Sequence, residues 1–172
     1  FLILALYFTP GHSNTNQECS GSHPTKFCQS KREILKILHF NDVYDITEGT
    51  QEPVGGIAKF KTALDYHKDE NTLIVFSGDV FNPSTLSTLT RGEHMVEPLN
   101  AFGIDVACLG NHDFDFGVNR LINLMSQCKF PWLLSNVFDR NTGQPVAGAK
   151  EYVIINKAGY KIGIFGLAEI EW

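Results

Sequence analysis

The stretch Thr72-Leu-Ile-Val-Phe-Ser-Gly-Asp79 decides the fold class of this chain. The run from Thr72 to Phe76 is short, continuous and almost entirely apolar, which is typical of a strand buried on both faces of a parallel sheet. A polar segment with a glycine follows at once, so the strand ends there and a loop begins. Because ligands in such sheets lie beyond the carboxyl ends of the strands, Asp79 is a candidate functional residue.

Strand and helix patterns alternate on both sides of this run. Apolar residues at Ile57, Phe60 and Leu64 have helical spacing. The remaining pattern predicts strands over 34–40, 105–109 and 131–135, helices over 93–102 and 119–128, and a β-hairpin of 152–155 with 161–165. This alternation predicts an α/β domain with a mostly parallel sheet and an antiparallel addition.

The composition is that of an ordinary globular domain. The chain has 172 residues, of which 43% are hydrophobic and 19% charged, enough for one domain with a sizeable core. The formal net charge of -5 argues against binding to a nucleic-acid duplex, because phosphate contacts need clustered Lys and Arg. An acidic protein can still bind a small anionic substrate when metal ions supply the positive charge.

The chain opens on an apolar run, residues 1–8, without an initial Met. The run is too short to span a bilayer, and it resembles the apolar core of a secretory signal peptide. We therefore predict a partial signal peptide and flexible leader over 1–30, a catalytic domain over 31–172, and a secreted or extracellular location. The alternative is an apolar terminus or strand, and membrane anchoring stays open.

The four cysteines leave the compartment undecided. Cys19 and Cys28 lie in the polar leader and could pair in an exported protein. Cys108 and Cys128 lie in apolar patterns, so we expect inert buried thiols there. The sequence contains no Cys-x-x-Cys motif, which excludes a zinc ribbon.

Each of the first three predicted strands is followed by side chains that bind hard metal ions. These segments are Asn41-Asp-Val-Tyr44, Ser77-Gly-Asp79 and Gly110-Asn-His-Asp-Phe-Asp115. Carboxylates, an amide oxygen and an imidazole suit Mn, Mg, Zn or Fe(II). A pair of ions needs one carboxylate that reaches both, and Asp79 is the best candidate for it. Singly, each Asp could instead be a turn or helix-cap residue, but three successive strand ends make coincidence a poor explanation.

These motifs resemble those of the 5'-nucleotidase branch of the calcineurin-like metallophosphoesterases. The resemblance rests on His39-Phe-Asn-Asp-Val-Tyr44, on Ser77-Gly-Asp79, on Gly110-Asn-His-Asp-Phe-Asp-Phe-Gly117, on Gly55-Gly-Ile-Ala-Lys59 and on Phe130-Pro-Trp-Leu-Leu-Ser-Asn136, and it runs from about Leu35 to Trp172. It implies a layered α/β/β/α sandwich and the hydrolysis of phosphate monoesters, nucleotides first among them, by a metal-activated water.

The resemblance also assigns roles to individual positions. It implies two divalent ions, with Asp42 on the first, Asp79 bridging both, and Asn111 on the second. His112 and Asp115 would be the catalytic pair: His112 faces the phosphate and stabilises charge or protonates the leaving oxygen, and Asp115 orients its ring. Asp113 is expected to brace the loop.

Two departures from the family pattern qualify these roles. The family's first motif usually reads Asp-x-His, whereas Tyr44 stands at the His position here; it is a candidate metal ligand, or else a neutral non-ligand. The family completes its site with a later isolated His and a Gly-x-His-x-His motif, and neither follows before Trp172. The chain is therefore expected to be the amino-terminal part of the catalytic domain, with an incomplete sandwich.

Two other functions remain possible on the same residues. The scaffold could serve a phosphodiesterase or a phosphoprotein phosphatase, because the leaving group is recognised elsewhere. The chain could instead belong to a catalytically impaired homologue that binds a phosphorylated ligand, which Tyr44 favours and the presence of Asn111, His112 and Asp115 argues against. We expect His39 to be a structural hydrogen-bonding residue.

Overall fold

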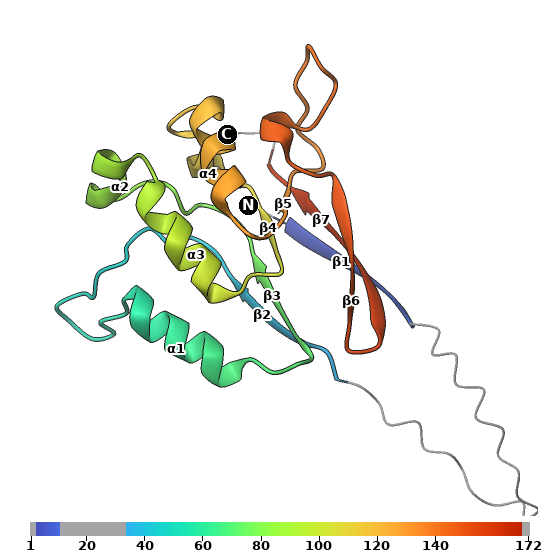
Figure 1. The fold of residues 1–172 in the computed structure, drawn as a ribbon, viewed down its shortest axis with the longest axis horizontal. Coiled ribbons are helices and arrows are strands. Elements are labelled where there is room, and N and C mark those ends of the chain that lie inside the picture. Colours follow the sequence, from blue (N-terminus) through green and yellow to red (C-terminus); the bar gives the residue numbers. More distant parts are fainter. Residues whose placement is uncertain (1–2, 11–33, 170–172) are drawn as a thin grey trace, which may run out of the picture.

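The computed structural model describes residues 3–10, as backbone, and residues 34–169. Three layers follow one another in Figure 1: helices, a parallel sheet, and an antiparallel sheet. The parallel sheet has the strand order β2-β3-β4-β5 and consists of β2 (Lys36–Phe40), β3 (Thr72–Phe76), β4 (Val106–Cys108) and β5 (Trp132–Leu133). Every residue of β3 is buried, as the sequence predicted for its apolar run.

Three helices cover one face of the parallel sheet, namely α1 (Ile57–His67), α3 (Val96–Phe102) and α4 (Val118–Gln127). The core between helices and sheet is rich in aromatic rings. The ring of Phe40 on β2 lies 4.9 Å from that of Phe60 on α1 and 5.7 Å from that of Phe102 on α3. Edge-to-face contacts of this kind add to the burial of the rings and fix the helices over β2.

The antiparallel sheet packs on the other face. It has the order β1-β7-β6 and consists of β1 (Ile3–Pro10), β7 (Tyr160–Leu167) and β6 (Tyr152–Lys157). Ile162 and Ile164 of β7 form a second core with Leu73 and Val75 of β3. The two sheets approach closely at Gly166, because a Cβ there would lie 2.4 Å from the Cys108 sulfur.

The backbone of Ile3–Pro10 is a strand, β1, paired antiparallel with β7 from Ile3↔Leu167 to Pro10↔Tyr160. This conformation is the alternative that the sequence left beside a signal peptide. The signal peptide itself stays a prediction, and so does the flexible leader over 14–30, which lies outside the described residues together with Cys19 and Cys28.

The antiparallel sheet exposes an apolar outer face. Tyr152, Ile154 and Phe165 are large, exposed side chains of β6 and β7, and they alternate with the residues that face β3. The described residues therefore build the first three layers of the predicted α/β/β/α sandwich and no helical layer beyond β6 and β7. Within the same residues, no helix is long and apolar enough to cross a membrane.

The sequence missed one helix and placed several boundaries only roughly. The helix α2 (Thr85–Thr90) had no predicted counterpart; it begins in a capping box in which Ser84 and Ser87 satisfy each other's backbone amides. The expected helix over 93–102 is a 3-10 turn, Glu93–Met95, followed by α3. Further 3-10 turns cover Asn111–Phe114 and Val146–Gly148.

Of the two cysteines within the described residues, Cys108 is buried, as predicted, and Cys128 is only half-buried. Cys108 is fully buried, and burial raises the pKa of its thiol to about 12. Burial likewise raises the pKa of Cys128 to about 11. Since the thiolate is the reactive form of cysteine, neither residue is a nucleophile at neutral pH.

Candidate functional site

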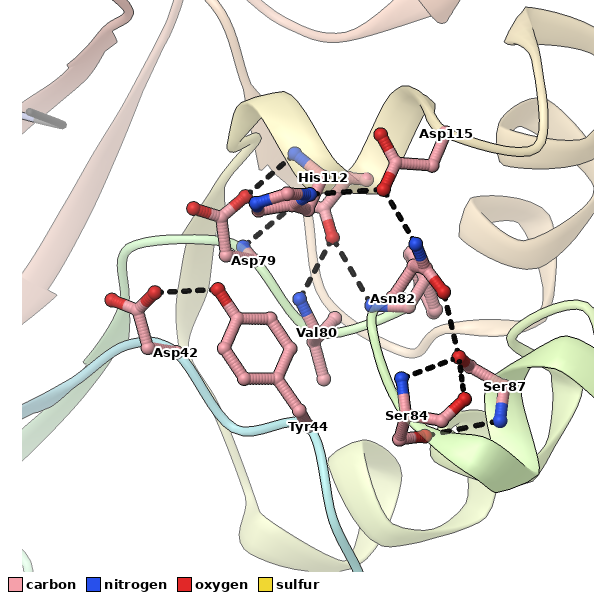
Figure 2. A network of polar contacts seen from close by, with 11 residues as sticks. Asp42, Tyr44, Asp79, Val80, Asn82, Ser84, Ser87, His112 and Asp115 are labelled. Atoms are coloured by element: carbon pink, nitrogen blue, oxygen red, sulfur yellow. Dashed lines mark hydrogen bonds and ion pairs between the residues drawn. The ribbon is translucent and has the colours of Figure 1, made fainter.

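The loops that follow β2, β3 and β4 meet at one edge of the parallel sheet. Figure 2 shows Asp42 and Tyr44 from the first loop beside Asp79 from the second, with His112 and Asp115 of the third above them. The backbone amide of Asp42 donates to the Gly78 carbonyl at 3.1 Å, which ties the first loop to the second. The structure thus brings five of the predicted side chains into one site, namely Asp42, Tyr44, Asp79, His112 and Asp115.

Asp42 and Asp79 both have left-handed backbone conformations, with φ of 55° and 64°. Such conformations are uncommon for residues other than glycine, although Asp tolerates them better than most. Backbone of this kind persists only where the surroundings determine it, and it clusters at functional sites. Here the two outliers coincide with the two carboxylates that the sequence singled out.

The Asp79 carboxylate is held by the third loop. One of its oxygens accepts the backbone amide of His112 at 2.8 Å. Burial raises the pKa of Asp79, and the charges of Asp42 and Asp115 add to this effect, while the His112 amide opposes it. The edge of the sheet therefore concentrates negative charge, an arrangement that a bound cation would stabilise.

Asp113 braces the site from below, as the sequence predicted. Its side chain is 1% exposed and accepts four backbone amides, those of Gly110 at 2.8 Å, Asp79 at 3.1 Å, Val80 at 2.9 Å and Phe81 at 3.3 Å. Burial raises the pKa of Asp113 to about 6, against the lowering effect of these hydrogen bonds. One buried carboxylate thus fixes the Asp79 loop against the loop after β4.

Two glycines allow these loops to touch. A Cβ at Gly78 would lie 2.4 Å from the Gly110 nitrogen, and a Cβ at Gly110 would lie 2.1 Å from an Asp79 carboxylate oxygen. Real Cβ atoms do not approach other atoms so closely, so a side chain at either position must displace its neighbour. The glycine in each motif therefore serves the contact between the loops as well as the turn.

We expect Gly110→Ala to displace the Asp79 carboxylate. Overpacking of this kind costs about 1–3 kcal/mol of stability, and here the strain falls on a site residue. Chemical denaturation and calorimetric titration with Mn²⁺ measure the two effects, with losses expected in both.

Gly49→Ala is the matched control for this change. Its new Cβ would meet no atom closer than 3.5 Å, so stability and Mn²⁺ affinity should change little. Equal behaviour of the two variants would show that the contact between Gly110 and Asp79 is not tight in solution.

His112 and Asp115 form the predicted pair. The His112 Nδ1 lies 2.9 Å from an Asp115 carboxylate oxygen, in a 3-10 turn that places residues i and i+3 on one side. This hydrogen bond raises the pKa of His112, and partial burial opposes the rise. Because Nδ1 is engaged, Nε2 is the atom that can face a substrate.

The Tyr44 hydroxyl donates to an Asp42 carboxylate oxygen at 2.6 Å. Burial, followed by this hydrogen bond and by the charges of nearby carboxylates, raises the pKa of Tyr44 above its ordinary value. The ring stands edge-on to His112, with 6.1 Å between ring centroids. Tyr44 is therefore a neutral hydrogen-bond donor in this arrangement, and its ring contacts the third loop at His112.

Comparison with known proteins gives these loops a family. Residues 35–170 match the model of the calcineurin-like phosphoesterase family. The chain belongs to this family. The match includes all three loops of the site, so the sequence resemblance and the fold it implied are confirmed.

Several relatives of this phosphoesterase are 5'-nucleotidases. The rat 5'-nucleotidase is 32% identical over 80% of the chain and 26% of its own length. The snake venom 5'-nucleotidase of Naja atra is 31% identical over 77% of the chain and 28% of its own length. The structure of Haemophilus influenzae NAD nucleotidase is similar with a TM-score of 0.65 and 27% identity, over 80% of the chain and 26% of that protein. The chain thus spans about a quarter of the length of these relatives.

The donor set of the phosphoesterase fits divalent ions in kind. Asp42 and Asp79 offer carboxylate oxygens, and Asn111, whose side chain is exposed, offers an amide oxygen at the start of the 3-10 turn. Oxygen donors of this type suit hard cations. Among the described residues, no three His, Cys, Asp or Glu side chains are grouped as metal ligands.

Sequence reasoning missed one residue of the site, Asn82. Its side-chain amide donates to an Asp115 carboxylate oxygen at 2.6 Å. The only sign of this role in the sequence is that Asn82 stands three positions after Asp79. His39 behaves as predicted, because its Nε2 lies 2.7 Å from the Ser77 hydroxyl and links the ends of β2 and β3.

Proposed function

We propose that this phosphoesterase hydrolyses phosphate monoesters, and nucleotides in particular. The observation that carries the proposal is the pair His112–Asp115, whose His112 backbone amide donates to the half-buried carboxylate Asp79 at the edge of the sheet. A polar imidazole with a raised pKa next to a cluster of acidic oxygen donors suits the transfer of a phosphoryl group to water.

Two divalent ions, Mn, Zn, Mg or Fe, are the proposed cofactors. Asp42 would hold the first ion, Asp79 would bridge both, and Asn111 would hold the second through its amide oxygen. When bound, the ions would lower the pKa of a water molecule and offset the charge of the phosphate. The concentration of negative charge around Asp79 supports a cation site here.

His112 is the proposed proton donor to the leaving group. Its raised pKa favours the protonated ring, in which both nitrogens carry hydrogen. As the bond between phosphorus and the leaving oxygen breaks, Nε2 gives its proton to that oxygen and the ring becomes neutral. The Nδ1 hydrogen stays in its bond to Asp115, which keeps the ring in place.

Tyr44 is proposed to orient Asp42 and not to bind a metal ion. Its hydroxyl already donates to Asp42, and its raised pKa opposes the tyrosinate form that a ligand requires. Tyr44 as a metal ligand remains the alternative, and Tyr44→Phe distinguishes the two by the stoichiometry of bound metal.

The nucleotide as substrate rests on the relatives. Two of them are named 5'-nucleotidases and one is named an NAD nucleotidase. Phosphodiester hydrolysis and phosphoprotein hydrolysis are alternatives on the same scaffold, and so is binding of a phosphorylated ligand without turnover. A panel of AMP, cyclic AMP and a phosphoserine peptide separates the three kinds of hydrolysis, and no phosphate release from any of them would indicate binding alone.

The proposed function predicts phosphate release from AMP that depends on added Mn²⁺ or Zn²⁺. Asn111→Ala is expected to lower both the metal affinity and the activity, because it removes the amide oxygen proposed to hold the second ion. Removing a residue that supports a metal site typically lowers metal affinity or activity about 10–100-fold. The protein expressed as its gene encodes it is titrated with metal by calorimetry, and phosphate is measured by a colorimetric assay.

Asn119→Ala is the matched control, since Asn119 is an exposed residue of α4 outside the three loops. An Asn111→Ala variant with unchanged metal affinity would contradict the ligand assignment. A wild-type protein that binds Mn²⁺ and AMP without releasing phosphate would contradict hydrolysis and support the non-catalytic binder.

We also propose that residues 31–172 form the amino-terminal part of the catalytic domain and that the protein is exported. The apolar run at residues 1–8 and the similarity to a snake venom 5'-nucleotidase support export. Expression with a reporter at the carboxyl end, followed by mass measurement of any secreted product, tests both the location and the removal of the leader.

A further inference from the structure

We infer that Asn82 is a positioning residue for the His112–Asp115 pair. The inference rests on the proposed function, because it concerns the proton that His112 gives to the leaving group. Asn82 belongs to the loop after β3, whereas the pair belongs to the loop after β4, so the residue joins two of the three loops of the site. Figure 2 shows its side chain directly beside Asp115, between Asp115 and Ser87.

The geometry centres on one carboxylate oxygen. The Oδ2 atom of Asp115 lies 2.9 Å from the His112 Nδ1 and accepts the Asn82 side-chain amide at 2.6 Å. A carboxylate held by a single donor can rotate about its bond to Cβ. A second donor on the same oxygen removes that freedom and fixes where the His112 ring can point.

The other end of the Asn82 side chain contacts Ser87, at the start of α2. The side-chain oxygen of Asn82 lies 2.7 Å from the Ser87 hydroxyl, which lies equally close to the Ser84 carbonyl. Because an ionised carboxylate only accepts hydrogen bonds, the NH₂ end of the Asn82 amide faces Asp115. Ser87 is fully buried, and its hydroxyl accepts the Ser84 amide at 2.7 Å in the capping box of α2. The chain of contacts therefore runs from a buried helix start, through Asn82 and Asp115, to His112.

This support matters because the pair itself is partly open to water. The side chains of His112 and Asp115 are 39% and 34% exposed, so water competes for both partners of their hydrogen bond. Asn82 is half-buried and occupies one of the positions from which water would approach Asp115. Loss of Asn82 should leave the pair present but loosely oriented.

The expected consequence is selective for the step in which the leaving oxygen takes a proton. A nucleoside 5'-oxygen needs that proton from Nε2 when its bond to phosphorus breaks, whereas a nitrophenolate oxygen leaves without it. Misorientation of His112 should therefore slow the hydrolysis of AMP more than that of p-nitrophenyl phosphate. A general loss of fold would slow both substrates equally.

The test compares Asn82→Ala with Asn100→Ala in the protein expressed as its gene encodes it, loaded with Mn²⁺. Asn100 is also half-buried, and its side chain donates to the Gln127 carbonyl at 3.0 Å and accepts the Lys129 amide at 2.8 Å, so its removal breaks two hydrogen bonds away from the site. Asn82→Ala should lower kcat for AMP about 10–100-fold, with KM little changed, and kcat for p-nitrophenyl phosphate by less than about threefold. Asn100→Ala should leave both near wild type.

Three further measurements show whether the effect acts through His112. In a His112→Ala background, Asn82→Ala should cost nothing more, because its only proposed action is through His112. In proton NMR spectra of the wild type, the His112 Nδ1 hydrogen should resonate far downfield, and in Asn82→Ala it should broaden through exchange with water. Isosteric Asn82→Asp keeps an acceptor for Ser87 but loses the donor to Asp115, so it should match Asn82→Ala on AMP.

Each outcome separates this inference from the function on which it rests. An inactive wild type overturns the proposed function. An active wild type in which Asn82→Ala behaves like Asn100→Ala overturns the role of Asn82, as does an equal loss on both substrates or a further loss in the His112→Ala background. Asn82→Asp with wild-type activity on AMP would also overturn it, since the donor would then be dispensable.

Discussion

Replacing His112 by alanine is expected to lower kcat for AMP by about 10²–10⁴-fold, the usual contribution of a positioned general acid. The proton that is proposed to reach the leaving oxygen starts at Nε2 of the His112 ring, whose Nδ1 is held by Asp115 at 2.9 Å. KM should change much less, because the phosphate would remain bound by the metal ions. Steady-state kinetics with AMP and with p-nitrophenyl phosphate measure the effect, and the second substrate should lose less.

The pH profile provides the control for this assignment. The hydrogen bond to Asp115 raises the pKa of His112, so removing it in Asp115→Ala lowers that pKa. Since the protonated ring is the proposed donor, the alkaline limb of kcat should move to lower pH in Asp115→Ala. A limb that stays in place, or moves to higher pH, would show that another group supplies the proton.

Replacing Asp113 by alanine is expected to lower the free energy of unfolding by about 3 kcal/mol or more. A buried amide that loses its acceptor costs about 1–3 kcal/mol, and Asp113 serves the amides of Gly110, Asp79, Val80 and Phe81. Water can enter the space and recover part of this loss. Urea denaturation followed by circular dichroism measures the change.

Two variants calibrate the Asp113 result. Asp113→Asn keeps one acceptor oxygen but turns an amide group toward backbone donors, so its loss should be intermediate. Asp139→Ala removes a surface carboxylate that accepts the amides of Asn141 at 2.8 Å and Thr142 at 3.0 Å, and it should cost much less. Equal costs for Asp113→Ala and Asp139→Ala would contradict the bracing role, because they would make burial irrelevant.

The buried position of β3 in the parallel sheet was within reach of the sequence. The apolar run over 72–76 is buried on both faces, and a run of that kind has few other places in a soluble fold. The site was predictable for a related reason: Asp42, Asp79 and His112 each follow a strand, and the carboxyl ends of parallel strands meet at one edge.

The elements that the sequence missed depend on contacts distant in the chain. The helix α2 is rich in Thr and Ser, which have modest helix propensity, and it forms because its capping box satisfies its first amides. Asn82 carries no local signal either, since its partner Asp115 is 33 residues away. Gly110 reads as a turn glycine in sequence, although the Asp79 carboxylate occupies the space of its missing side chain.

The sequence by itself indicated an α/β domain with a mostly parallel sheet, the edge of that sheet at which the candidate site lies and, through the motifs at its strand ends, the family to which the chain belongs. The fold class and the edge follow from the period of apolar residues and from side-chain types at strand ends, both of which are local properties, whereas the layers were implied only by the family resemblance. Only the tertiary structure decided how the site is held. Asp113 accepts backbone amides from two loops, Gly78 packs closely on Gly110, and Asn82 donates to Asp115. Each of these contacts joins segments that meet only after the sheet has formed, because a hydrogen bond or a close approach depends on distances in space that spacing along the chain does not specify.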